Sequence, residues 1–236
     1  MASILVGLGC SGSTPIPGVV RPEPGAGFLD RLPGPMPEFG PFDDASDALG
    51  AACALFLSKP NASVGHIKDP EVALRSSSEY CAWLYYTPDK KYQMSMMTDQ
   101  SDLSDPQRKR RTCRLPAYVE DSRFSSWNIK YIFALHNHPF GGTLSLNDMR
   151  QIIALANLHE WVVETKTGRV PLAIVAFFSK PEREVPSCDG FYQYTPETRD
   201  LLRFVKKGDA WLRQELGKVT WIDANTYLLN GREYRH

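Results

Sequence analysis

Two histidines and an aspartate are spaced along this chain as the ligands of one metal ion would be. His136 and His138 close an apolar segment with one residue between them, and Asp148 follows ten residues after the second histidine. Alternate residues of a strand point to the same side, so both imidazoles can reach one ion while Asn137 faces away. Two nitrogen ligands and one oxygen ligand leave the fourth tetrahedral position of Zn²⁺ for water, as in catalytic zinc sites. The spacing therefore predicts a catalytic zinc centre.

The elements expected around these residues bring the ligands together. Residues 129–135 form an apolar run that predicts a mostly buried strand ending at the histidines. Pro139 and the two glycines after it indicate a loop, and apolar residues at helical spacing predict an amphipathic helix over 145–159. Asp148 then lies in the first turn of this helix. The structural alternative is that Ser145-x-x-Asp148 is only a helix capping box.

The combination of strand, His136-x-His138-Pro139, glycine loop and Ser145-x-x-Asp148 resembles the JAMM motif of the JAB/MPN zinc metallopeptidases. This resemblance implies that the two histidines and Asp148 bind Zn²⁺, and that Ser145 helps to stabilise a tetrahedral intermediate. It also implies an α/β fold of the JAB/MPN (cytidine-deaminase-like) type, with a mixed sheet flanked by helices. Six residues separate His138 from Ser145 where the family usually has seven, so we expect a tighter loop over the metal.

The resemblance also requires an upstream glutamate as general base. Glu71, Glu79 and Glu120 precede the histidines. Glu79 is the best placed, because it opens the first of two expected strands, 79–86 and 91–98, which are joined by a turn. The family's glutamate occupies such a position, after the first helix and at the start of the first hairpin. The alternative for Glu79 is an ordinary solvated carboxylate at a strand end.

Similarity to the family covers about residues 42–180, which we expect to form the metallopeptidase domain. Residues 42–57 look like the alanine-rich opening helix of a bacterial JAB branch that is often attached to secreted or polymorphic toxin proteins. The apolar run 170–178 suits a central strand. A polar insertion at 98–120 contains the basic stretch 108–114, which we expect to be a solvated loop or, alternatively, a flap near the active-site rim.

The first 41 residues differ from the rest in composition, with eight prolines and eight glycines. Such a segment is expected to be a tether, extended and removable unless it docks. Cys10 follows a short apolar stretch, as in a trimmed lipoprotein signal, although no Lys or Arg precedes that stretch. Membrane association is therefore expected only if Cys10 is lipidated. The sequence leaves two compartments as alternatives: the cytoplasm, or the cell exterior if the protein is exported or lipid-anchored.

Residues 181–236 are expected to form an extension packed on the domain. Thr195-Pro196 has the form of an N-cap followed by a first helical residue, which predicts a helix over 195–216. Asn230-Gly231 between two short apolar and aromatic stretches predicts a terminal hairpin. The tryptophans of this extension are expected to pack it against the domain.

Overall composition limits the classes of function. The chain has 236 residues, of which 42% are hydrophobic, enough for one sizeable core. Its 27 basic and 27 acidic residues balance, so no global field favours nucleic acid as a partner. The five cysteines show no metal-finger spacing, and Cys53 and Cys81 fall on apolar faces, where we expect core thiols. Their odd number favours a reducing compartment, or one cysteine with another fate.

These observations together predict a zinc-dependent peptidase or isopeptidase. Its substrate would be a protein or peptide, including an isopeptide-linked ubiquitin-like modifier, with Glu79 as the base and Ser145 supporting the oxyanion. Two alternatives stay open. One is a JAB-like binding or scaffold module without turnover, and the other is a processing module of a bacterial toxin or secretion system.

Overall fold

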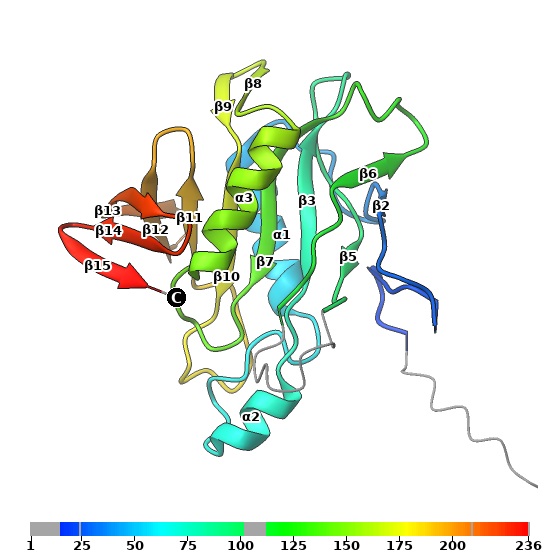
Figure 1. Cartoon of the computed structure of the whole chain (residues 1–236). Helices are drawn as coiled ribbons and strands as arrows, with labels where there is room; N and C mark the ends of the chain where they lie inside the picture. Colours follow the sequence, from blue (N-terminus) through cyan, green and yellow to red (C-terminus); the bar gives the residue numbers. More distant parts are fainter. Residues whose placement is uncertain (1–14, 24, 102–111, 209, 236) are drawn as a thin grey trace, which may run out of the picture.

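The centre of the fold is a mixed sheet of eleven strands (Figure 1). The structure is a computed structural model and describes residues 15–23, 25–101, 112–208 and 210–235. β7 pairs in parallel with β10, and β1 with β5, while the other neighbours are antiparallel. In spatial order, with β4 (Tyr92–Met94) beside β3, the strands are β1 (Val19–Val20), β5 (Met97–Thr98), β3 (Cys81–Tyr86), β7 (Lys130–Asn137), β10 (Ala173–Phe178), β11 (Gly190–Thr195), β12 (Asp200–Lys207), β13 (Ala210–Asp223), β14 (Thr226–Leu229) and β15 (Arg232–Arg235).

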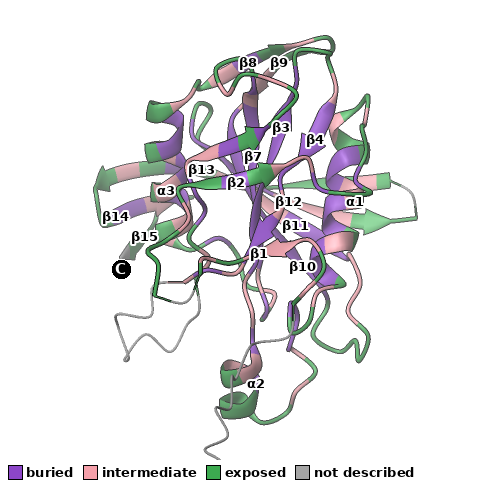
Figure 2. Ribbon diagram, turned by 90° about the vertical axis from the view of Figure 1, so that its right-hand side faces the viewer, coloured by how far each residue is buried: buried purple, intermediate pink, exposed green. Residues whose placement is uncertain are grey.

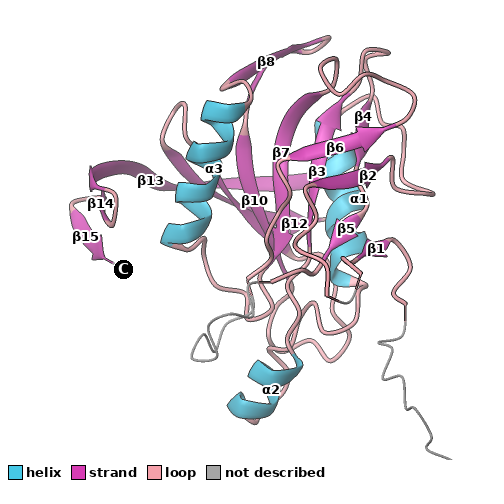
Figure 3. Ribbon diagram, turned by 45° about the vertical axis from the view of Figure 1, so that its right-hand side comes forward, coloured by secondary structure: helices cyan, strands magenta, loops and turns pink. Residues whose placement is uncertain are grey.

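Helices cover both faces of the sheet's centre. α1 (Ala45–Leu57) and α3 (Leu146–Leu158) lie on opposite sides of β7 and β10 (Figure 3). α2 (Pro70–Ser76) lies at the end of the molecule, largely exposed, while the central strands are buried (Figure 2). The expectation of an α/β fold with a mixed sheet flanked by helices is confirmed at this level.

Strand periodicity assigns alternate residues of β7 to the two faces. Phe133 and Leu135 belong to the core under α1, whereas Ala134 belongs to the core under α3. His136 therefore continues the α3 side and Asn137 the α1 side. α3 begins at Leu146, with Ser145 as its N-cap, close to the predicted start.

The described part of the N-terminal 41 residues is docked, which differs from the expected free tether. β2 (Arg31–Gly34) pairs in parallel with β6 (Tyr118–Asp121). Leu32, Met36 and Phe39 are buried, because apolar side chains recur between the prolines and fill the core. Cys10 lies outside the described residues. Among those that are described, no helix is long and apolar enough to cross a bilayer.

The helix expected over 195–216 is wrong, because this stretch forms two antiparallel strands, β12 and β13. Cross-strand pairing of its alternating large side chains outweighs the local signal of Thr195-Pro196, which instead begins a turn. The terminal hairpin is confirmed. Asn230 and Gly231 both have positive φ, 51° and 76°, as its two-residue turn requires.

Both tryptophans of the extension contact the sheet. The Trp211 ring packs edge-on against Phe191 at 5.0 Å, and the Trp221 indole N–H donates to the Tyr194 hydroxyl at 3.1 Å. The remaining described strands, β8 (Val162–Thr165) and β9 (Gly168–Pro171), form a separate hairpin.

Two disulfides replace the expected core thiols. Cys53 pairs with Cys188, and Cys81 with Cys113. Cys53 and Cys81 are buried, as expected. The partner of Cys53 lies 135 positions away in the sequence, and the partner of Cys81 lies 32 positions away. Such distant connectivity cannot be read from the spacing of cysteines in one sequence.

Burial of the N-terminal segment predicts that Leu32→Ala destabilises the protein by about 2–5 kcal/mol, the usual cost of emptying a core leucine site. Leu32 is fully buried, whereas Leu212, at 47% exposed, provides a matched control. We expect Leu212→Ala to change the free energy of unfolding by no more than about 0.5 kcal/mol. Chemical denaturation measures both, and equal small effects would mean that the segment is not docked.

Candidate metal centre

The three candidate ligands meet between the end of β7 and the first turn of α3. The Nε2 atoms of His136 and His138 lie 2.9 Å apart. Asp148 places Oδ1 at 3.7 Å from the first of these atoms and Oδ2 at 3.4 Å from the second. Ligand atoms about 2.0–2.1 Å from a tetrahedral zinc ion are separated by about 3.3 Å. The observed separations bracket that value, so the side chains present fit a zinc ion.

His138 is held by its other ring nitrogen. His138 Nδ1 lies 2.7 Å from the backbone carbonyl of Gly142. Metal-binding histidines commonly donate one ring N–H to a carbonyl, which leaves the other nitrogen unprotonated for the ion. The short loop reaches this geometry through Gly141, whose φ of 73° favours glycine.

Asp148 is oriented by the helix that carries it. Its Oδ2 accepts a hydrogen bond from the Ser145 backbone N–H at 2.6 Å, and the Ser145 Oγ accepts from the Asp148 N–H at 3.2 Å. The capping box is therefore present, as the structural alternative predicted. It also aims the carboxylate at the two imidazoles, so cap and ligand geometry coexist.

The charges of this cluster favour a cation at its centre. Burial alone would raise the pKa of Asp148, but the neighbouring imidazoles bring it well below the usual range. Burial alone would lower the pKa of His138, but the carboxylates of Asp148 and Glu79 outweigh it and raise the pKa to about 9. The pKa of His136 is lowered, chiefly by burial. Positive charge thus collects on His138 beside the Asp148 carboxylate.

Glu79 lines the same cleft as His136 and Asp148. Burial raises the pKa of its carboxyl to about 8, and the negative charge of Asp148 adds to this effect. His138 and the Cys113 backbone N–H act in the opposite direction. A carboxyl whose pKa lies near neutrality suits general acid–base chemistry.

The other two upstream glutamates lie away from this cleft. Glu71 is in the first turn of α2, where it is exposed and pairs with Arg75 at 3.4 Å. Glu120 is an exposed residue of β6. Of the three candidates, the structure brings only Glu79 to the ligands.

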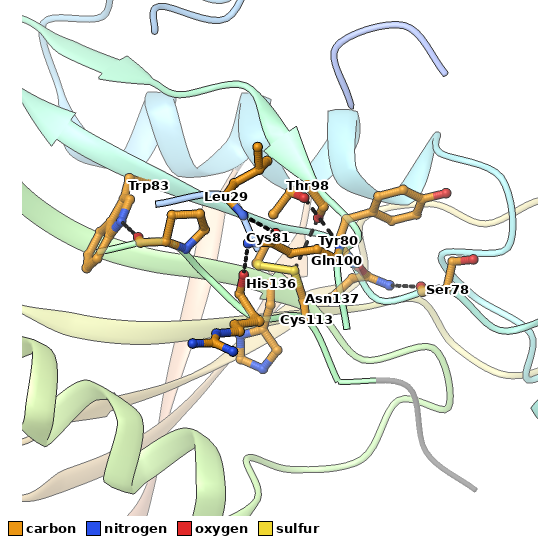
Figure 4. The surroundings of a disulfide bond; sticks show 12 residues. Leu29, Ser78, Tyr80, Cys81, Trp83, Thr98, Gln100, Cys113, His136 and Asn137 are labelled. Carbon is orange, nitrogen blue, oxygen red and sulfur yellow. Dashed lines mark hydrogen bonds between the residues drawn. A yellow bond between two sulfur atoms is a disulfide. The ribbon is translucent and has the colours of Figure 1, made fainter. Parts of the chain in front are cut away.

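Asn137, the residue between the histidines, has a role that the sequence did not reveal. It faces away from the cleft, as expected, and is fully buried. Its amide donates to the carbonyls of Ala62 and Ser78 at 2.7 and 3.0 Å and accepts from the Tyr80 N–H at 2.7 Å (Figure 4). Asn137 thus holds the backbone on both sides of Glu79.

The insertion between the hairpin and β7 contributes one side of the cleft. Residues 112–116 are here called the wall segment. The stretch before it, 102–111, lies outside the described residues and includes most of the basic stretch 108–114. Residues 112–115 line the cleft opposite Asn147 and Gln151 of α3. Arg114 stacks over the Phe28 ring at 4.1 Å, so this basic side chain contacts the docked N-terminal segment.

Comparison with family models, curated proteins and solved structures found no match to this chain. What the site can do is therefore argued from its own atoms. Three ligands, a nearby carboxyl and a hydroxyl at a helix start are the parts needed for metal-assisted hydrolysis.

We expect the purified protein to bind about one Zn²⁺ per chain through His136, His138 and Asp148. His136→Ala combined with His138→Ala should abolish this binding, while His66→Ala, at an exposed histidine, should not. Mass spectrometry of metal content is the measurement. Because zinc must displace the His138 proton, affinity measured against a chelator should fall as the pH drops below about 9. Stoichiometric zinc in the double variant would contradict the assignment.

Proposed function

We propose that this chain is a zinc-dependent peptidase or isopeptidase of the JAB/MPN type, which hydrolyses an amide bond in a protein or peptide. One observation carries the proposal: Glu79, with a pKa raised to about 8, shares a cleft with His136 and Asp148, whose ligand atoms cluster with that of His138. The mixed sheet with helices on both faces is compatible with that family's fold.

In the proposed reaction the chain's own residues move protons and stabilise charge. When bound, zinc acts as a Lewis acid, lowers the pKa of a coordinated water and, as a nearby positive charge, favours the ionised form of Glu79. Glu79 takes a proton from the attacking water and later gives it to the leaving amine. Ser145, exposed at the start of α3, uses a lone pair in the capping box and keeps its hydroxyl proton to donate to the oxyanion.

The walls of the cleft favour a polypeptide substrate. On one side the cleft is lined by residues 112–115 of the irregular wall segment, which include Arg114, and on the other by Asn147 and Gln151 of α3, whose side chains are uncharged amides. Backbone and amide groups pair well with peptide groups and demand no particular charge. A linear peptide and the isopeptide linkage of a ubiquitin-like modifier both satisfy this chemistry.

The test is Glu79→Gln, which we expect to reduce hydrolysis by about 10² to 10⁴-fold through loss of positioned proton transfer. Zinc content and melting temperature should stay near those of the unmodified protein, because glutamine keeps the size and is uncharged like the protonated acid. Substrates come from mass-spectrometric screening of peptide mixtures and modifier conjugates.

Glu71→Gln and Glu120→Gln are the matched controls, since both glutamates are exposed and outside the cleft. They should retain full activity. Full activity in Glu79→Gln would refute the assigned base. Loss of zinc in that variant would instead make Glu79 a ligand or a structural support.

A further inference from the structure

The disulfide between Cys81 and Cys113 lies close to His136, one of the candidate metal ligands (Figure 4). Cys81 follows Glu79 by two residues and is the cross-strand partner of His136. Cys113 lies in the wall segment, and its backbone is close enough to Glu79 to oppose the rise in the pKa of that carboxyl. Both cysteines line the cleft. One covalent bond therefore ties the wall segment to the strand that begins beside the base.

The wall segment is also held by hydrogen bonds at Arg114 and Pro116. The Arg114 N–H donates to the Gln100 carbonyl, and the Gln100 side chain donates to the Arg114 carbonyl, both at 2.8 Å. The Trp83 indole donates to the Pro116 carbonyl at 2.8 Å. Gln100 also accepts from the Leu29 N–H at 2.8 Å, which connects the segment to the docked N-terminus. At Cys113, where the segment meets Glu79, the disulfide is the covalent attachment.

We propose that the Cys81–Cys113 disulfide is a positioning bond for the hydrolysis proposed above, and that its reduction by a dithiol lowers turnover. The inference rests on that proposed function. The bond ties Cys113, at the cleft, to the start of β3 beside Glu79. Breaking it removes this covalent constraint on the wall segment at Cys113, while the hydrogen bonds of Arg114 and Pro116 and the candidate zinc ligands stay in place.

The two cysteines differ in exposure, which favours attack by the reductant at Cys113. Cys81 is 2% exposed, whereas Cys113 is half-buried at the cleft. A thiolate of the dithiol attacks the Cys113 Sγ, the disulfide bond breaks, and the electron pair passes to the Cys81 Sγ, which takes up a proton. The second thiol of the reductant then attacks the mixed disulfide. This step releases the Cys113 thiol and the oxidised cyclic reductant, a transfer of two electrons and two protons.

The second disulfide provides a matched control within the same chain. Cys53, on α1, and Cys188 belong to the core on the opposite face of the sheet from α3. Its cysteines are 135 positions apart, against 32 for the first pair. Removing it should free at least as much chain entropy in the unfolded state. A general loss of stability would therefore affect this control at least as strongly.

The experiment compares Cys81→Ser plus Cys113→Ser with Cys53→Ser plus Cys188→Ser, both loaded with zinc. Hydrogen exchange of peptides covering the wall segment and Glu79 is measured together with zinc content, kcat and KM. We expect exchange at least about tenfold faster in the first variant, with kcat lowered about tenfold and zinc unchanged. The second variant should match the unmodified protein. Treating that second variant with dithiothreitol should reproduce the first, since it then has one described disulfide left to reduce.

Unchanged exchange and kcat in the first variant would overturn the inference, as would equal losses in both variants. If the first variant does not fold, Cys113→Ser alone replaces it, because Cys81 then stays as a core thiol. If the unmodified protein hydrolyses nothing, the proposed function fails. The exchange data then decide by themselves whether the disulfide holds the wall segment against Glu79.

Discussion

The buried amide of Asn137 is the interaction on which the geometry of the candidate site depends. Two of its three hydrogen bonds join the end of β7, beside both histidines, to the backbone before and after Glu79, and the third reaches the Ala62 carbonyl. Leaving one buried hydrogen-bonding group without a partner costs about 1–3 kcal/mol. The position of the end of β7 relative to the backbone around Glu79 is therefore strongly favoured over alternatives. Because alternate residues of a strand face opposite sides, one tripeptide places two candidate metal ligands on one side of the sheet and an anchor in the core on the other.

Rigid elements surround this tripeptide on three sides. β7 lies between β3 and β10 in the middle of the sheet, and the capping box at the start of α3 aims Asp148. The fourth side is different, because the wall segment is irregular and is tied down by a disulfide and a few hydrogen bonds. The candidate ligands are therefore held by regular elements, whereas the wall segment is held in part by the Cys81–Cys113 disulfide.

The parts of this account that local patterns encode were predictable from the sequence. Apolar runs and helical spacing located β7, β10 and α3, and Asn230-Gly231 located the terminal turn, because each signal arises within a few residues. Partners distant in the sequence were not predictable. The docking of Leu32, the two disulfides and the hydrogen bonds of Asn137 all depend on pairing across the fold. The helix expected over 195–216 is wrong for the same reason, since cross-strand pairing decides the structure of β12 and β13.

The central claim is that one metal ion binds where these side chains converge. Anomalous diffraction at the zinc edge, from crystals grown with Zn²⁺, tests it most directly. The account predicts one strong peak within about 2.0–2.2 Å of the Nε2 atoms of His136 and His138 and of an Asp148 carboxylate oxygen. A strong peak elsewhere with none at these three residues, or no peak at a saturating zinc concentration, would contradict it.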